Sequence, residues 1–401
     1  MSKRKHAENE EEDLLQEELF LDASKWDPKL VLGKIEGLAV ELTEAVAKGQ
    51  DFPLSLCRRD SKNVLWDEEG KLRLGTQKVT KTMFGRQGVG LKRYVMLWKI
   101  MAFVQKLLLD KQQCTQREAY YCLVNHFAHQ GEFNDALMEV ASLIGCSRIS
   151  LGICAASAGS IAGSVQWLEG QNQPVDCTQV GSTGKRIPGD IDNVRFSSLG
   201  ARYIIVVEKD AVFMYLCEHR LWETIPCILV TGCGYPPLSV RAVVHKLSDT
   251  LHVPVLGLVD YNPHGVRILL TYKFGSARMG AESHKYATPN LQWLGLHHGD
   301  IFGMNPESEP TNLPEAHNQS RRYYEESVVP ESSLQPWGSS DDIVFRSLIS
   351  LPYFKVNASY RRELLNSARE RMKAEIEALN ANEWDAVANM VVRKILRHQY
   401  F

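Results

Sequence analysis

The 401-residue sequence has no long hydrophobic run. No apolar stretch is long enough to cross a bilayer, and the charged N-terminal residues include no hydrophobic segment of the signal-peptide kind. We therefore expect no membrane anchor and no secretory leader. The nine cysteines are scattered, odd in number and never spaced as C-x-x-C. This usage favours reduced thiols inside a cell and argues against a zinc knuckle or a disulfide scaffold.

An excess of either charge is also missing. The formal net charge is −2, and the acidic residues among the first 20 positions more than account for it, so the rest of the chain is slightly basic. Any nucleic-acid-binding surface must therefore come from the placement of charges. The basic run Lys3–His6 could act as a nuclear-import signal, but a solvated tail is the better interpretation of so short a run. We expect residues 1–27 to form a disordered acidic tail.

The next part of the chain is helical in pattern. We predict an N-terminal helical extension over residues 28–89, with an amphipathic helix near Val31–Val46. Three further helices are predicted at Lys92–Asp110, "CTQREAYYCLVNHF" and "GEFNDALMEVASLIG". The apolar stretches "SRISLGICAA" and "SIAGSVQWLEG" flank a Ser/Gly turn and predict a β-hairpin. Three helices followed by a hairpin are typical of a winged helix, a fold often used to dock on duplex DNA, so residues 90–175 are predicted to be such a domain.

Residues 176–401 have the pattern of an α/β domain. Three buried strands, each running into a helix, are predicted from "ARYIIVVEKDAVF", "IPCILVTGCGYP" and "VPVLGLVDYNPHG". This alternation indicates a parallel sheet with crossover helices. Residues 303–342 are rich in Pro, Ser, Asn and Glu and are predicted to be a loop or insertion, and residues 359–400 a charged helical region. The predicted fold class is therefore multi-domain α/β.

Two of these strands end in carboxylates. Glu208 follows "YIIVV" and Asp260 follows "VLGLV", and active groups in open parallel sheets collect at the carboxyl ends of strands. Oxygen ligands from neighbouring strands suit Mg²⁺, and Asn262 lies where its carbonyl oxygen could help. The alternative is that these are turn and helix-capping residues, which is the better interpretation of a single acid. Two acids at equivalent strand ends leave the metal site and the capping role about equally supported.

The adjacent tyrosines in "CTQREAYYC" raise a second possibility. Thr115 and Glu118 have the spacing of a capping box, which predicts that a helix begins just before the tyrosines. Neighbouring helix positions point about 100° apart, so only one of Tyr120 and Tyr121 can face the core squarely. Arg117 is four residues before Tyr121, where its guanidinium can reach the phenol and bind phosphate oxygens. The other interpretation is ordinary packing, which the spacing alone strongly favours over a nucleophile.

Five motifs, in order, resemble those of the family that contains the A subunit of DNA topoisomerase VI and the meiotic recombination proteins that break DNA. "TQREAYY" is similar to the family's nucleophile motif, and "VVEKDAVF" resembles its metal-binding glutamate strand. The others are "TGCGYPPLSVR", "LVDYNPHGVRILLTYKFGS" and "LQWLGL", with a weaker echo in "ARERMKAEIEAL". The resemblance runs from about Gly90 to Asp300.

This resemblance implies a winged-helix (CAP-like) domain followed by a Toprim domain with a parallel sheet. It implies that Tyr121 is the nucleophile, that Arg117 helps to bind the phosphate, and that Mg²⁺ is held by Glu208 and Asp260, with Asn262 at the family's remaining metal position. In the family the tyrosine of one protomer meets the metal site of the other. The resemblance thus implies double-stranded DNA as substrate, a homodimer or a heterodimer with a paralogue, and a place in the nucleus. The chain has no P-loop (GxxxxGK[ST]), so any ATP dependence would come from a topoisomerase VI B-like ATPase-fold subunit.

The sequence departs from the family pattern at three positions. Asn262 replaces the second aspartate of a D-x-D pair, Ala158 replaces a lysine in the hairpin turn, and Cys233 replaces the lysine of a Gly-Lys-Gly turn. The expected function is a DNA-cleaving transesterase that forms meiotic double-strand breaks through a tyrosine linked to the 5′ phosphate. One alternative is a topoisomerase VI A subunit, which reseals the break. The departures motivate the other, a DNA-binding paralogue with an impaired metal site.

Overall fold

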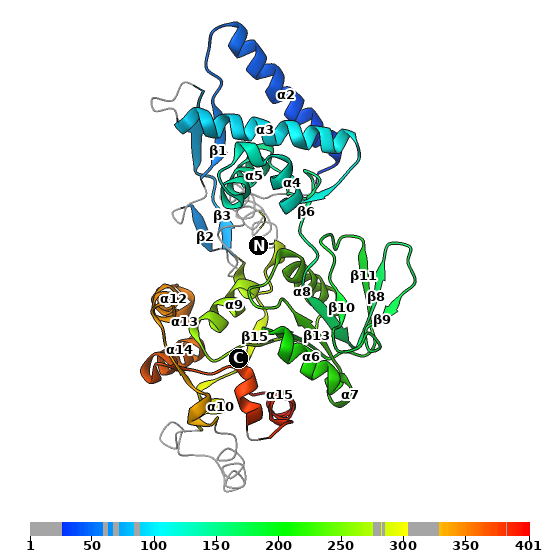
Figure 1. Ribbon diagram of the computed structural model, residues 1–401, viewed down its shortest axis with the longest axis vertical. Helices are drawn as coiled ribbons and strands as arrows, with labels where there is room; N and C mark the ends of the chain where they lie inside the picture. Colours follow the sequence, from blue (N-terminus) through cyan, green and yellow to red (C-terminus); the bar gives the residue numbers. More distant parts are fainter. Residues whose placement is uncertain are drawn as a thin grey trace, which may run out of the picture. The chain divides into compact units, whose positions relative to one another are not determined.

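The structure is a computed structural model (Figure 1). It describes residues 26–58, 63–66, 72–83, 89–275, 282, 285–303, 329–381 and 383–401. The predicted acidic tail therefore lies outside the described residues, apart from Trp26 and Asp27. In the described part of the chain, no helix has the length and apolar character needed to span a membrane.

The chain divides into two compact units. The first contains residues 1–157, 188–190 and 274–289, and the second contains residues 158–187, 191–273 and 290–401. The main boundary thus lies at residues 157/158, earlier than the predicted 175/176.

Helices form most of the first unit. They are α2 (Pro28–Ala47), α3 (Val89–Leu109), α4 (Gln116–Cys122) and α5 (Gln130–Ile144), with the short 3-10 helix η1 at Val124–His126. Asp27 caps α2 by accepting a hydrogen bond from the backbone N–H of Lys29. Helix α5 ends at Gly145, whose φ of 88° lies in the left-handed region that favours glycine. The apolar faces of these helices form one core, which includes Leu97, Met101, Phe133, Leu137 and Val140.

Short strands complete the first unit. β1 (Leu54–Cys57) pairs with β4 (Lys78–Lys81), and β2 (Val64–Trp66) pairs with β3 (Leu72–Leu74), both antiparallel. The predicted extension over residues 28–89 is therefore only partly helical. The sequence pattern did not predict these strands, because they are three or four residues long and their apolar and polar residues alternate poorly.

The predicted hairpin over residues 147–170 is wrong. β6 (Ile153–Cys154) pairs in parallel with β5 (Cys114–Thr115), whereas β7 (Ser160–Gly163) lies in the large sheet of the second unit. All four residues of β7 are buried, as expected for a strand covered on both faces rather than for an exposed wing. β8 (Val165–Glu169) pairs instead with β9 (Val175–Asp176) and β11 (Val194–Ser198). The three helices of the predicted winged helix are present, but this pair of stretches forms no wing.

A six-stranded sheet organises the second unit, in the order β10-β7-β13-β12-β14-β15. Its four parallel strands are β12 (Tyr203–Val207), β13 (Cys227–Thr231), β14 (Val255–Leu258) and β15 (Leu291–Gly295), while β7 and β10 (Lys185–Arg186) are antiparallel. The crossover helices are α6 (Asp210–Glu218), α8 (Leu238–Leu251) and α9 (Pro263–Phe274). The predicted parallel sheet with crossover helices is confirmed.

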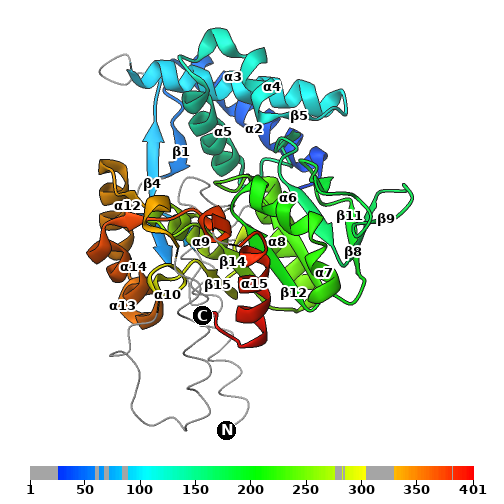
Figure 2. The ribbon, with the colours of Figure 1, turned by 60° about the horizontal axis from the view of Figure 1, so that its bottom comes forward.

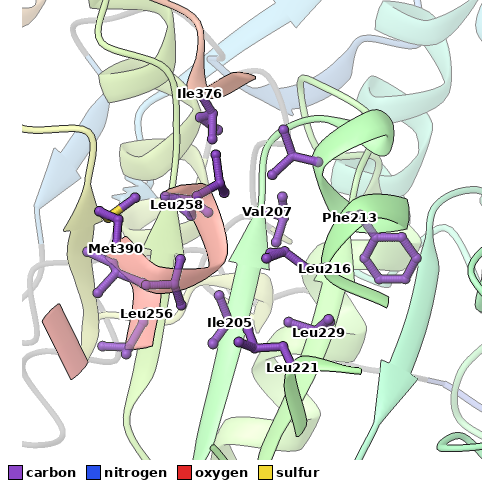
Figure 3. Packing of buried hydrophobic residues seen from close by; sticks show 14 of the residues in the cluster. Ile205, Val207, Phe213, Leu216, Leu221, Leu229, Leu256, Leu258, Ile376 and Met390 are labelled. Carbon is purple, nitrogen blue, oxygen red and sulfur yellow. The ribbon is translucent and has the colours of Figure 1, made fainter. Parts of the chain in front are cut away.

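One face of this sheet carries a large apolar core. Figure 3 shows Ile205 and Val207 of β12 in the same cluster as Phe213 and Leu216 of α6 and Met390 of α15 (Ala386–Leu396). Figure 2 shows α6, α15 and the short helix α7 (Leu221–Thr224) on one side of the strands. Each fully buried side chain of this size stabilises the fold by about 1.5–3 kcal/mol, so the sheet is a rigid platform for the residues at its edge.

The C-terminal part consists of short elements. They are α10 (His298–Phe302), η5 (Glu331–Ser333), β16 (Gln335–Pro336), α12 (Ser339–Ile349), α13 (Tyr353–Val356), α14 (Ala358–Glu370), β17 (Met372–Lys373), η6 (Ile376–Ala381) and α15. The predicted insertion 303–342 lies mostly outside the described residues, although η5, β16 and the start of α12 fall within it. The predicted helical region 359–400 holds two helices, separated by β17 and η6.

Candidate metal centre and nucleophile

Strand order brings the two predicted acids together. Glu208 follows β12 directly, and Asp260 lies two residues beyond β14. β12 and β14 are parallel neighbours, and the chain runs outward from them in opposite directions, to β13 and to β15. This is the topological switch point, where open α/β sheets form their sites. The backbone N–H of Asp260 donates to Oε2 of Glu208 over 2.8 Å, so the predicted meeting of the strand ends is confirmed.

Both acids are buried. Only 9% of Glu208 and 4% of Asp260 is exposed. Burial, reinforced by the charge of Asp260, raises the pKa of Glu208 to about 7. Burial also raises the pKa of Asp260, although Lys209 opposes that shift. The pair therefore forms a pocket of negative charge that a cation would stabilise.

Glycine is required beside this pair. A Cβ on Gly265 would lie 2.5 Å from the carbonyl oxygen of Asp260 and 3.2 Å from Oε2 of Glu208. The backbone N–H of Gly265 donates to Oδ1 of Asn262 over 2.8 Å. Asn262 thus satisfies a backbone donor in the first turn of α9, which is the capping role considered for it above.

Lys209 and a C-terminal segment close the other side of the acidic pair. The ammonium of Lys209 lies 3.2 Å from Oδ2 of Asp260. It also lies 3.2 Å from Glu375 and 3.1 Å from Glu377. The backbone N–H of Ile376 donates to Oδ1 of Asp260 over 2.9 Å. The sequence analysis did not predict these contacts. Glu375, Ile376 and Glu377 lie in "KAEIEAL", part of the C-terminal stretch that resembles the family only weakly.

The donor set fits Mg²⁺ in its chemistry. Mg²⁺ prefers one or two carboxylates and keeps several waters, and two carboxylates converge here from adjacent strands. Oε1 of Glu208 accepts no hydrogen bond from the described residues, so its lone pairs are available for a ligand bond. No group of three or more His, Cys, Asp or Glu side chains suited to a metal occurs in the described parts of the chain. Glu208 and Asp260 would therefore hold the ion with water or substrate oxygens.

A chain of polar contacts lies at the same edge of the sheet. The Tyr235 hydroxyl is 3.2 Å from Nδ1 of His264, and Nε2 of His264 is 3.8 Å from Oδ1 of Asp341. Tyr235 follows the turn that contains Cys233, whose thiol donates to Oδ1 of Asp210 over 3.5 Å. At Ala158, another position that departs from the family pattern, the backbone N–H donates to the Ile187 carbonyl oxygen. Tyr235 is half exposed, and the backbone N–H of its neighbour Gly234 donates to the Glu208 carbonyl oxygen.

Tyr121 lies in the first unit, on α4. Thr115 and Glu118 form the predicted capping box. The backbone N–H of Thr115 donates to Oε2 of Glu118 over 2.7 Å, and the backbone N–H of Glu118 donates to the Thr115 hydroxyl over 3.2 Å. Tyr121 is 57% exposed, and the Arg117 guanidinium lies 5.8 Å from its ring centroid. Tyr120 is partly buried, and its ring centroid lies 6.0 Å from the ring centroid of Phe133. The predicted division into a core tyrosine and an exposed tyrosine is confirmed, while the nucleophile remains a prediction.

A buried ion pair fixes the first residue of α4. Arg148 binds Oε2 of Glu282 through Nε at 3.0 Å and Nη2 at 2.9 Å, and its Nη1 donates to Gln116 over 3.0 Å. Glu282 is almost fully buried and belongs to the 274–289 segment of the first unit. Sequence reasoning missed this support, because Glu282 lies far from α4 in the chain. The pair holds the helix that carries Tyr121.

Two family models match parts of the chain. Residues 203–395 match the family model of the Toprim domain shared by Spo11 and the A subunit of topoisomerase 6, and residues 92–153 match the model described as "Type IIB DNA topoisomerase". These two matches define a Toprim-containing protein of the type IIB topoisomerase class, and the acidic pair lies within the Toprim match.

Relatives with names narrow this class. The chain is 37% identical over 317 residues to "Meiotic recombination protein SPO11-2" of Oryza sativa subsp. indica, covering 77% of this chain and 75% of the relative. It is 30% identical over 351 residues to "Meiotic recombination protein SPO11" of Homo sapiens, covering 87% and 83%. It is 29% identical over 348 residues to the A subunit of DNA topoisomerase 6 from Arabidopsis thaliana, covering 87% and 76%. The chain belongs to the family formed by Spo11 and the topoisomerase 6 A subunits.

Proposed function

We propose that this chain is a DNA-cleaving transesterase that forms the double-strand breaks that initiate meiotic recombination. The observation that carries the proposal is the exposed Tyr121 beside Arg117, in a chain that also carries a buried acidic pair at the Toprim switch point. A tyrosine with only a packing role would be at least partly buried, as Tyr120 is. The meiotic role is supported by relatives named as meiotic recombination proteins.

The reaction uses the phenol and not water. The Tyr121 oxygen attacks a backbone phosphorus and loses its proton to solvent. The bond from phosphorus to the 3′ oxygen breaks, and that oxygen takes up a proton from solvent. The 5′ phosphate remains on the tyrosine, so one phosphodiester replaces another. Arg117 binds the non-bridging phosphate oxygens.

The acidic pair serves the same phosphate. Glu208 and Asp260 would hold a Mg²⁺ ion, which would supply positive charge to the phosphate and the leaving oxygen. Tyr121 and the acidic pair belong to different units, and we propose that the tyrosine of one protomer works with the acids of its partner. Cutting both strands then requires a homodimer or a heterodimer with a paralogue. A B-type ATPase-fold subunit is the proposed further partner, and the nucleus the proposed location.

Covalent adduct formation tests the proposal. Replacing Tyr121 with Phe is expected to abolish protein–DNA adducts while DNA binding, measured by electrophoretic mobility shift, is retained. Tyr120→Phe is the matched control, because it removes the neighbouring hydroxyl from a packed position and is expected to keep the adduct. Adducts that persist in Tyr121→Phe and vanish in Tyr120→Phe would overturn the assignment.

Two other functions have a specific observation in their favour. The match to the A subunit of topoisomerase 6 supports a strand-passing enzyme, and relaxation of supercoiled DNA with an added ATPase subunit would establish it. The side-chain oxygen of Asn262 accepts a hydrogen bond from the backbone of α9, which supports a DNA-binding paralogue with a weakened metal site. DNA binding that is indifferent to Mg²⁺, with no adduct in the presence of any partner, would establish that second alternative.

A further inference from the structure

Lys209 is the cation that the structure places against the acidic pair. Its ammonium contacts Asp260 at 3.2 Å, and together with Glu375 and Glu377 it lies among three carboxylates. Asp260 is buried and already accepts a backbone hydrogen bond on Oδ1, so Lys209 engages its other oxygen. The positive charge of Lys209 thus balances the negative charge of the buried Asp260.

Glu375 and Glu377 differ from Asp260 in their surroundings. Their side chains are 58% and 41% exposed, whereas that of Asp260 is 6% exposed. An ammonium and a divalent ion on the same buried carboxylate repel each other strongly, because the surroundings screen them poorly. The flexible four-carbon stem of lysine allows its ammonium to move while the backbone stays in place. The carboxylates of Glu375 and Glu377 already contact this ammonium and can accept it.

We propose that Lys209 is a positioning residue that holds Asp260 while no divalent cation is bound and shifts onto Glu375 and Glu377 when one binds. This inference rests on the proposed metal site at Glu208 and Asp260. It makes the segment from Ala374 to Glu377 sensitive to metal, because the same segment donates to Asp260 and receives Lys209. Nothing in the reaction itself requires this coupling.

The proposal predicts effects of opposite sign on metal affinity. Replacing Lys209 with Met removes the competing charge and is expected to tighten Mn²⁺ binding about fivefold or more. The double variant Glu375→Gln, Glu377→Gln leaves Lys209 without an alternative partner and is expected to weaken binding by a similar factor. Adding Lys209→Met to that double variant is expected to restore the affinity of Lys209→Met alone, because the two glutamates act on the metal site through Lys209. Independent effects would return the affinity only to that of the native protein, so the expected result is non-additive.

Free Mn²⁺, measured by its electron paramagnetic resonance signal during titration of the full chain, provides the readout. Lys355→Met is the matched control, because it removes the same charge from an exposed lysine of α13 in the same unit. Circular dichroism checks folding. If Lys209→Met does not fold, Lys209→Gln and the exposed double variant carry the test.

The outcomes separate the inference from the proposed function. If Glu208→Gln and Asp260→Asn leave Mn²⁺ binding unchanged, the proposed metal site is wrong and the inference falls with it. If those variants lose Mn²⁺ while Lys209→Met binds it with equal or lower affinity, only the inference is overturned. A purely structural role for Lys209 gives that second result, because disorder at the site weakens binding.

Discussion

At the scale of single residues, the acidic pair depends on Gly265. A methyl group there would press on the carbonyl of Asp260 and approach the carboxylate of Glu208. We expect Gly265→Ala to destabilise the protein by about 1–3 kcal/mol through forced backbone movement. Gly37→Ala is the control, because it lies within α2 with nothing within 4 Å of the added methyl, and a gain of about 0.5–1 kcal/mol is expected there. Urea midpoints that move equally for both variants would contradict this account.

The sequence could predict residues that depend on local geometry. The capping box at Thr115 and the exposure of one of the two adjacent tyrosines follow from helix spacing, and both agree with the structure. The contact between Lys209 and Glu377 could not be found this way, since 168 residues separate them. No local rule specifies which surface carboxylates a C-terminal segment brings back to a strand end.

At the scale of elements, a buried cluster joins α10 to α15. The ammonium of Lys394 donates to Oδ2 of Asp300 at 2.5 Å and to Nδ1 of His297 at 3.0 Å. The His297 ring also stacks on Phe401, at 4.6 Å between ring centroids. Burial and the charge of Lys394 lower the pKa of His297 to about 3, although Asp300 opposes this shift.

This cluster predicts a pH dependence of stability. An unfolded histidine titrates near pH 6.5, so between about pH 6.5 and 3 the unfolded state binds more protons than the folded state. Stability is therefore lost as pH falls through that window. Between pH 7 and pH 5 we expect the native protein to lose on the order of 1–2 kcal/mol more than His297→Asn, which keeps an acceptor for Lys394. Equal losses in denaturant titrations at the two pH values would show that the fold does not lower the pKa of His297.

Elements were predictable where their pattern was long. The strands around Ile205 and Leu256 are continuous apolar runs, and they were predicted correctly as parallel. The stretch around Ile161 is just as apolar, but its partner is β13, more than sixty residues away, rather than the next strand along the chain. Local pattern gives the existence of such a strand and cannot give its neighbour.

At the scale of the whole molecule, the proposed pairing between protomers can be tested with a mixed dimer. One protomer carries Tyr121→Phe, and the other carries Glu208→Gln with Asp260→Asn. If tyrosine and metal site act across the dimer, one complete site remains, and single-strand nicks are expected. The DNA should be attached to the protomer that keeps Tyr121. A mixed dimer that cuts neither strand would show that both parts act within one protomer.

The central claim is that Tyr121 makes the bond to DNA. The most direct measurement is mass spectrometry of the adduct after digestion with nuclease and trypsin. Residues 118–148 form one tryptic peptide, which contains both tyrosines and no internal lysine or arginine. We predict a 5′-phosphonucleotide on Tyr121, located by fragment ions that separate the two positions. Modification of Tyr120, or of a residue outside this peptide, would contradict the account.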